Sequence, residues 1–117
     1  MNILLTGSEG FIGKHLHNSL RDLHNVIGLD KKLNQDILNT DLPDEVDLVI
    51  HLAGSSGVRH SLDNPQEYWE NNVEASRIIF NKYKDKRILY ASSSTAAEPH
   101  MNPYAASKFL METMAPE

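Results

Sequence analysis

The chain has 117 residues, a formal net charge of −5, no cysteine and a hydrophobic fraction of 40%. This length fits one compact domain, and the composition excludes collagen-like, disordered and disulfide-stapled chains as well as thiolate catalysis. The acidic balance argues against a general nucleic-acid binder, and no apolar run is long enough to span a bilayer. Met1 leads directly into a short apolar run without a basic segment, which predicts no signal peptide and a cytoplasmic protein.

Short runs rich in Ile, Val and Leu alternate with helical patterns. The predicted strands are Asn2–Thr6, Asn25–Leu29, Val46–Leu52 and Arg87–Ala91. The predicted helices are Phe11–Leu20, Pro65–Lys82 with Asn64 as its cap, and Tyr104–Met114, whereas residues 31–45 are predicted to form a loop with one helical turn. Because the strands lack polar/apolar alternation, they predict a single α/β domain: a doubly wound, Rossmann-like parallel sheet. Its ligands should bind at the carboxyl ends of the strands.

A glycine-rich turn, GSEGFIG at residues 7–13, joins the first predicted strand to the first predicted helix. Glycines allow a tight turn and a close approach to a pyrophosphate, and the helix N-terminus supplies amides and positive potential. A plain strand–helix connection is the alternative. A carboxylate about 20 residues on binds an adenosine ribose hydroxyl, and Asp30 lies at that distance, at the end of the second predicted strand. Asp30 would repel a 2′-phosphate and so favours NAD, although Lys31 and Lys32 leave NADP open.

A YxxxK motif, Tyr104 to Lys108, opens the last predicted helix. At this spacing the two side chains share one helix face, and a nearby cation favours the phenolate that a general acid/base needs. A hydroxyl from residues 92–95, at the end of the fourth predicted strand, would complete a proton relay. A solvated helix face is the alternative interpretation of this motif.

Taken together, these motifs resemble those of the extended short-chain dehydrogenase/reductase family, the NAD-dependent sugar epimerases and dehydratases. The resemblance covers only the family's N-terminal, cofactor-binding part. It rests on motifs that occur in the family's order: the GSEGFIG loop, Asp30, Asp36-Ile37, His51-Leu52-Ala53-Gly54, Asn71-Asn72-Val73, Ser92–Ser94 and Tyr104xxxLys108.

The resemblance implies an NAD site and a catalytic group. Its cofactor contacts would be Gly7, Gly10, Phe11, Ile12 and Gly13 at the pyrophosphate, Asp30 at the adenosine ribose, Asp36 and Ile37 at the adenine, Leu52, Ala53, Gly54 and Ser56 on the nicotinamide side, and Asn72 below the cofactor. Tyr104 would be the acid/base and Lys108 its partner, which also binds the cofactor. Ser93 matches the catalytic hydroxyl without a gap, and a shift of one residue would give Ser94 instead.

The related dehydratases follow that hydroxyl with an Asp-Glu pair, but here Ser94-Thr95 occupies those places. The resemblance therefore implies epimerisation or keto-reduction through a transient 4-keto form of a UDP- or dTDP-sugar. It also implies a homodimer through the helices Pro65–Lys82 and Tyr104–Met114. No metal site is expected, because His15 and His17 point to different helix faces.

Two departures from the family support a different reading. The connections at residues 31–45 and between Ser93 and Tyr104 are short for the family, and the chain ends at Glu117, before a sugar-binding half. The alternative is therefore a catalytically inactive dinucleotide-binding or dimerisation module, or a fragment of a longer enzyme.

Overall fold

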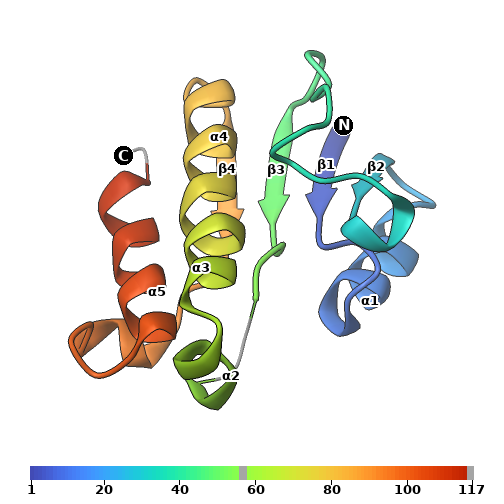
Figure 1. Cartoon of the computed structure of the whole chain (residues 1–117). Coiled ribbons are helices and arrows are strands. Elements are labelled where there is room, and N and C mark those ends of the chain that lie inside the picture. The colour runs from blue at the N-terminus through green and yellow to red at the C-terminus, as the bar shows by residue number, and fades with distance from the viewer. Residues whose placement is uncertain (56–57, 116–117) are drawn as a thin grey trace. The chain divides into compact units, whose positions relative to one another are not determined.

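The computed structural model describes residues 1–55 and 58–115 and comprises two compact units (Figure 1). The first unit contains Met1–Ala53 and Lys82–Tyr90, and the second contains Gly54–Asn81 and Ala91–Glu117. We describe each unit by itself.

The first unit is built on a parallel sheet of four strands in the order β2-β1-β3-β4. The strands are β1 (Asn2–Thr6), β2 (Asn25–Leu29), β3 (Leu48–His51) and β4 (Arg87–Tyr90). The chain leaves the central β1 toward β2 on one side and returns toward β3 on the other, which is the Rossmann-like arrangement that the sequence predicts. The bounds of β1 and β2 match the prediction, while β3 and β4 are shorter than predicted.

The centre of the sheet is buried on both faces. Ile3, Leu4 and Leu5 of β1 are at most 2% exposed, although successive strand residues point to opposite faces. Ile3 and Leu5 form a core cluster with Ile50, against which Leu16 and Leu20 of helix α1 (Phe11–Leu20) pack. The continuous apolar runs in the sequence therefore mark buried parallel strands, as expected.

The apolar pattern of α1 divides into two parts. Leu16 and Leu20 pack on the core, but Phe11 and Ile12 at the start of the helix are 83% and 59% exposed. The helical spacing of these residues thus overstates the buried face of α1.

The connection from β2 to β3 contains one helical turn, as predicted, the 3₁₀ turn η1 (Lys31–Leu33). Its far end is attached to the segment that precedes β4. The Tyr83 hydroxyl donates a 2.6 Å hydrogen bond to the carbonyl oxygen of Pro43, and Lys82 forms an ion pair with Asp44, which lowers the pKa of that carboxyl. Burial raises the pKa of Tyr83 to about 12, with a smaller contribution from the Asp44 carboxylate.

The second unit is helical, with α2 (Val58–Asp63), α3 (Pro65–Tyr68), η2 (Trp69–Glu74), α4 (Ala75–Lys82), the 3₁₀ turn η3 (Ser94–Ala97) and α5 (Pro103–Met114). The predicted helix over 65–82 is helical throughout, but its middle section η2 is π-helical. Helix α2 was not predicted.

Two asparagines precede helices of this unit, and they behave differently. Asn64 occupies the predicted cap position of α3 but makes no side-chain cap hydrogen bond. Its amide instead donates to the carbonyl oxygen of His60 in α2, at 3.2 Å. Asn102, for which no capping role was predicted, caps α5 by accepting a 2.8 Å hydrogen bond from the Ala105 amide.

Within the described ranges, no helix is both long and apolar enough to cross a membrane. The same residues contain no group of three or more His, Asp or Glu side chains that could hold a metal ion.

The Tyr83–Pro43 hydrogen bond predicts an alkaline loss of stability. Because the folded pKa of Tyr83 lies above its ordinary value of about 10, its contribution is complete below pH 10 and is lost as the pH rises toward 12. Tyr83→Phe should cost about 1 kcal/mol at pH 8, and the difference from wild type in urea unfolding should shrink as the pH rises from about 10 to about 12. A pH-independent difference would contradict this account.

Candidate functional site

The carboxyl ends of β1 and β3 are joined by Thr6. Its hydroxyl oxygen accepts hydrogen bonds from the amides of Leu52 and Ala53, both at 3.0 Å, and lies 2.7 Å from Nδ1 of the buried His51. With both lone pairs of the hydroxyl oxygen used, its proton is directed to His51. His51 thus packs at the end of β3, and Thr6 fixes the backbone that follows β3 beside the glycine-rich turn.

The glycine-rich turn is possible only with glycine at two of its positions. Gly7 has a φ of +70°, and a Cβ there would lie 2.9 Å from both the Ala53 nitrogen and the Leu52 carbonyl carbon. A Cβ on Gly13, in the first turn of α1, would lie 2.0 Å from the carbonyl oxygen of Gly7. Helix α1 therefore begins in direct backbone contact with the end of β1, as the phosphate-loop interpretation requires.

The start of α1 presents unpaired hydrogen-bond donors. Its N-cap is Gly10, and no side chain caps the helix. The amides of the first turn therefore have neither an intrahelical partner nor a side-chain acceptor. A bare glycine backbone at a helix N-terminus is a suitable site for a phosphate group.

Asp30 lies at the end of β2 and holds the turn in place. One carboxylate oxygen accepts a 2.9 Å hydrogen bond from the Glu9 amide, and the other accepts one of the same length from the Lys32 amide. Each carboxylate oxygen retains a second lone pair, so the predicted bond to a ribose hydroxyl remains available alongside this structural role.

The two residues expected beside the adenine lie in the connection that follows β2. Ile37 is 6% exposed, whereas Asp36 is half-buried, accepts a hydrogen bond from the Leu38 amide at 3.1 Å and lies 3.7 Å from the Lys31 ammonium. On the nicotinamide side, Leu52 and Ala53 are half-buried. Ser56 lies outside the described residues.

In the second unit, Asn72 is fully buried and connects two segments. Its Oδ1 accepts the Ser55 amide at 2.7 Å, while its Nδ2 donates to the Ser55 carbonyl at 3.0 Å and to the Ser107 hydroxyl at 2.9 Å. The adjacent Asn71 donates to the Ser55 hydroxyl at 2.8 Å. A Cβ on Gly54, where φ is +155°, would lie 2.6 Å from the Asn72 Oδ1. Since both amide protons of Asn72 are used within the chain, its position supports a structural role, and a direct cofactor contact stays a prediction.

Tyr104 and Lys108 share one face of α5, as the YxxxK spacing predicts. The Lys108 ammonium lies 6.0 Å from the centre of the Tyr104 ring and donates to the Ala91 carbonyl oxygen at 3.3 Å. Lys108 is only 8% exposed, and burial lowers its pKa. Tyr68, which is fully buried, packs edge-on against Tyr104 with ring centres 6.1 Å apart. A half-buried phenol beside a desolvated cation is suited to proton transfer.

Sequence reasoning missed two serines of this cluster. The hydroxyl of Ser107, inside the YxxxK motif, accepts a hydrogen bond from Asn72 and donates one to the Tyr104 carbonyl oxygen at 2.8 Å. Ser55 forms hydrogen bonds with both Asn71 and Asn72. No local pattern marks either residue. Ser93 is half-buried and its carbonyl oxygen accepts the Ala96 amide at 3.0 Å, which closes η3. The choice between Ser93 and Ser94 stays open.

These features fit an anionic dinucleotide. The glycine-rich turn and the uncapped start of α1 suit a pyrophosphate. The carboxylate at the end of β2 suits an adenosine ribose. Fold and turn together define a nucleotide-binding α/β domain of the Rossmann type. The chain belongs to the NAD dependent epimerase/dehydratase family, whose model matches residues 3–117.

Individual relatives agree with this assignment. The chain is 35% identical over 130 residues to the uncharacterised protein MJ1055 of Methanocaldococcus jannaschii, covering 80% of this chain and 40% of that protein. It is 29% identical over 157 residues to the UDP-glucose 4-epimerase of Yersinia enterocolitica, covering 96% and 47%. The solved structure of MoeE5 in complex with UDP-glucuronic acid and NAD matches with a TM-score of 0.89 at 28% identity, covering 98% and 48%.

The matches differ in length as well as in sequence. The chain spans less than half the length of each of these three relatives. The match to the Yersinia enzyme extends over 157 residues, more than the 117 of this chain, so that relative carries insertions within the matched region.

The contacts of Asn72 predict a large effect of truncation. Asn72→Ala would leave the half-buried Ser55 amide without its acceptor and the buried Ser107 hydroxyl without its donor, so the free energy of unfolding should fall by about 2 to 3 kcal/mol. The matched control is Asn81→Ala, an exposed asparagine of α4, which should change it by less than about 0.5 kcal/mol. Urea unfolding measures both, and similar losses in the two variants would contradict the role of Asn72.

Proposed function

We propose that this chain carries the cofactor-binding and acid–base residues of an NAD-dependent nucleotide-sugar epimerase, or of a related keto-sugar oxidoreductase, in the cytoplasm. The observation that carries the proposal is the pairing of Tyr104 with the desolvated Lys108 on α5, in a family defined by NAD-dependent epimerisation and dehydration. The relatives support the substrate class: the Yersinia enzyme is a UDP-glucose 4-epimerase, and MoeE5 was solved with UDP-glucuronic acid and NAD.

The glycine-rich turn would hold the pyrophosphate through the first-turn amides of α1, namely those of Phe11, Ile12 and Gly13. The Asp30 carboxylate would accept a hydrogen bond from an adenosine ribose hydroxyl through its remaining lone pairs. Its negative charge favours NAD over NADP. Bound NAD would supply the acceptor, and later the donor, of a hydride at sugar C4.

The protein's own contribution to the chemistry is proton transfer. Tyr104, as phenolate, would take the proton of the sugar 4-hydroxyl. It would return the proton once the 4-keto sugar has rotated to present its opposite face. The Lys108 ammonium favours that phenolate, and the low exposure of Lys108 strengthens their electrostatic interaction. The hydroxyl of Ser93 would donate to the same sugar oxygen. Ser107 and Asn72 would act indirectly, by holding the backbone around Tyr104.

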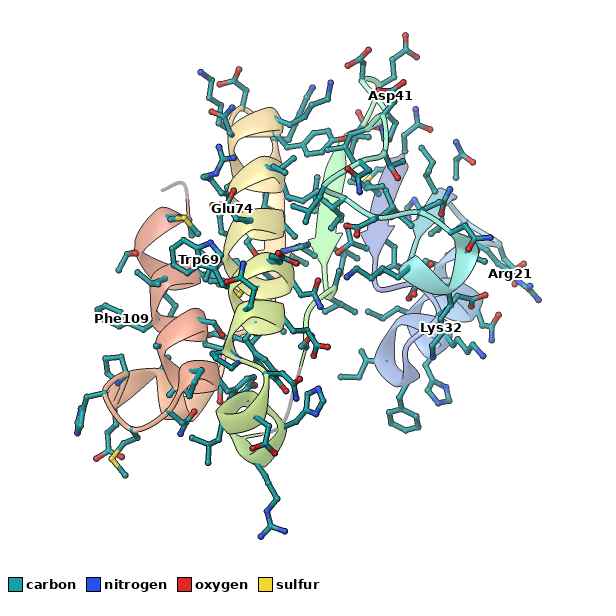
Figure 2. The ribbon with its side chains drawn as sticks, in the orientation of Figure 1. Arg21, Lys32, Asp41, Trp69, Glu74 and Phe109 are labelled. Atoms are coloured by element: carbon teal, nitrogen blue, oxygen red, sulfur yellow. The ribbon has the colours of Figure 1, made fainter. Side chains whose placement is uncertain are left out.

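We also propose a homodimer formed through the long helical elements of the second unit. Trp69, at the start of η2, is 47% exposed and Phe109 of α5 is 41% exposed (Figure 2). Two large apolar side chains exposed on neighbouring helices are typical of an interface between protein chains.

Dinucleotide binding can be tested apart from catalysis. A calorimetric titration with NAD⁺ should give saturable heat, and Asp30→Ala should weaken binding about tenfold or more, because it removes a charge-assisted hydrogen bond. Asp22→Ala, an exposed aspartate just beyond α1, is the control and should bind like wild type. Absence of both heat and thermal protection at millimolar NAD⁺ would refute dinucleotide binding.

Turnover provides the second test, with UDP- and dTDP-sugars as substrates and NMR detection of the C4 epimer or the keto sugar. Tyr104→Phe should lower the rate by about 10² or more while NAD⁺ binding persists. Ser93→Ala and Ser94→Ala, compared side by side, decide which hydroxyl takes part. If the wild-type chain binds NAD⁺ but turns over no sugar nucleotide, the enzyme proposal fails for this chain and the dinucleotide-binding module becomes the better description.

A further inference from the structure

A groove on the first unit lies along one side of α1, and the proposed function uses none of the side chains that line it. Its volume is about 230 Å³, and its lining residues are Ser8, Glu9, Lys14, His17, Asn18 and Arg21. The four residues from α1 and its C-terminal end recur at the spacing of a single helix face. We refer to it as the α1 groove.

The α1 groove is cationic in a chain whose formal net charge is −5. Lys14 and Arg21 are the basic side chains of the lining, His17 adds an imidazole ring, and Glu9 contributes the one carboxylate. Within the part of the chain that the structure describes, neither Lys14 nor Arg21 forms a salt bridge. Figure 2 shows Arg21 extending outward from the region of α1. The groove therefore has positive charge that no neighbouring carboxylate balances by direct pairing.

A second observation comes from Ser8, the one buried residue of the lining. Ser8 is 2% exposed, and its hydroxyl has no hydrogen-bond partner among the described residues. A buried hydroxyl without a partner is unfavourable, and a ligand with acceptor oxygens would satisfy it.

The backbone of β2 makes room for that hydroxyl. A Cβ on Gly28 would lie 2.8 Å from the Ser8 hydroxyl oxygen and 3.6 Å from a ring carbon of His17. The hydroxyl and the imidazole thus approach the same point beside Gly28. The Ser8 hydroxyl of the turn and the His17 ring of α1 thus lie on the same side of the groove that Lys14 and Arg21 also line.

We propose that the α1 groove binds a phosphate group. Its Lys, Arg, Ser, Asn and His side chains supply several hydrogen-bond donors, and a phosphate offers several strong acceptor oxygens with at least one negative charge. The phosphate belongs either to a free phosphorylated small molecule or to the 2′-phosphate of NADP. The proposal does not depend on dinucleotide binding, because inorganic phosphate by itself should occupy the groove.

The test is a titration with inorganic phosphate at constant ionic strength, followed by ¹H–¹⁵N NMR of the amides of residues 8–21. Saturable shifts are expected there. The double variant that combines Lys14→Gln with Arg21→Gln should bind phosphate about tenfold or more weakly, because it lacks two charged donors. The control pair, Lys84→Gln and Lys86→Gln, alters two exposed lysines that precede β4 and should change affinity less than about twofold. Ser8→Ala should weaken phosphate binding several-fold without lowering the urea midpoint, since it removes an unpaired buried hydroxyl.

Comparison of NADP⁺ with NAD⁺ identifies the source of the phosphate. A preference for NADP⁺ that disappears in the Lys14/Arg21 variant would assign the groove to the 2′-phosphate. Equal affinity for the two dinucleotides, with inorganic phosphate still bound in the presence of NAD⁺, would assign it to a separate phosphorylated molecule. Unsaturable shifts in wild type, or equal weakening by the control pair, would overturn the proposal and leave α1 with an ordinary solvated face.

Discussion

The contact between Gly13 and the carbonyl oxygen of Gly7 determines how closely α1 can begin at the end of β1. A Cβ on Gly13 would come to 2.0 Å from that oxygen, so the helix can start this close to the strand only because both positions lack side chains. The contact fixes the first-turn amides of α1 at the carboxyl end of β1. Thr6 brings the residues after β3 to the same edge, and Asp30 attaches the turn to β2. Three strand ends are thereby connected by one backbone contact and by the side chains of Thr6 and Asp30. The exposed side chains of Phe11 and Ile12 take no part in these contacts.

The second unit relies on buried polar groups that satisfy one another. Asn72 uses its side-chain carbonyl and both amide protons in hydrogen bonds within the chain. Ser107, which accepts one of those protons, donates in turn to the carbonyl oxygen of Tyr104. Such networks stabilise a single geometry when every member is paired. Lys108 differs, because its ammonium is buried beside one carbonyl oxygen of Ala91 at 3.3 Å. The fold thus combines a rigid polar scaffold with one under-solvated cation, a combination typical of sites that move protons.

The sequence predicted what depends on local pattern. The bounds of β1 and β2, the start of α1 at the glycine turn and the shared face of Tyr104 and Lys108 all follow from short-range rules of burial, turn geometry and helix spacing. The contacts of Ser55 and Ser107 could not be predicted, because they depend on segments that only the folded chain brings together. Helix α2 escaped prediction since it is short and ends just before a proline. Asn102 is a different case: an asparagine directly before Pro103 is a recognisable helix start, so that cap was within reach of the sequence.

The π-helical section η2 has a consequence for protein engineering. Residues next to each other in a regular α-helix point in different directions, yet Asn71 and Asn72 of η2 both bond to Ser55. A redesign that removes one residue to regularise this helix would rotate one of the two amides away from the loop, whichever residue is deleted. Helix propensity would improve, but the loop would lose one of the two asparagines that bind it. The segment η2 is therefore one to leave unchanged when the chain is shortened, fused or stabilised.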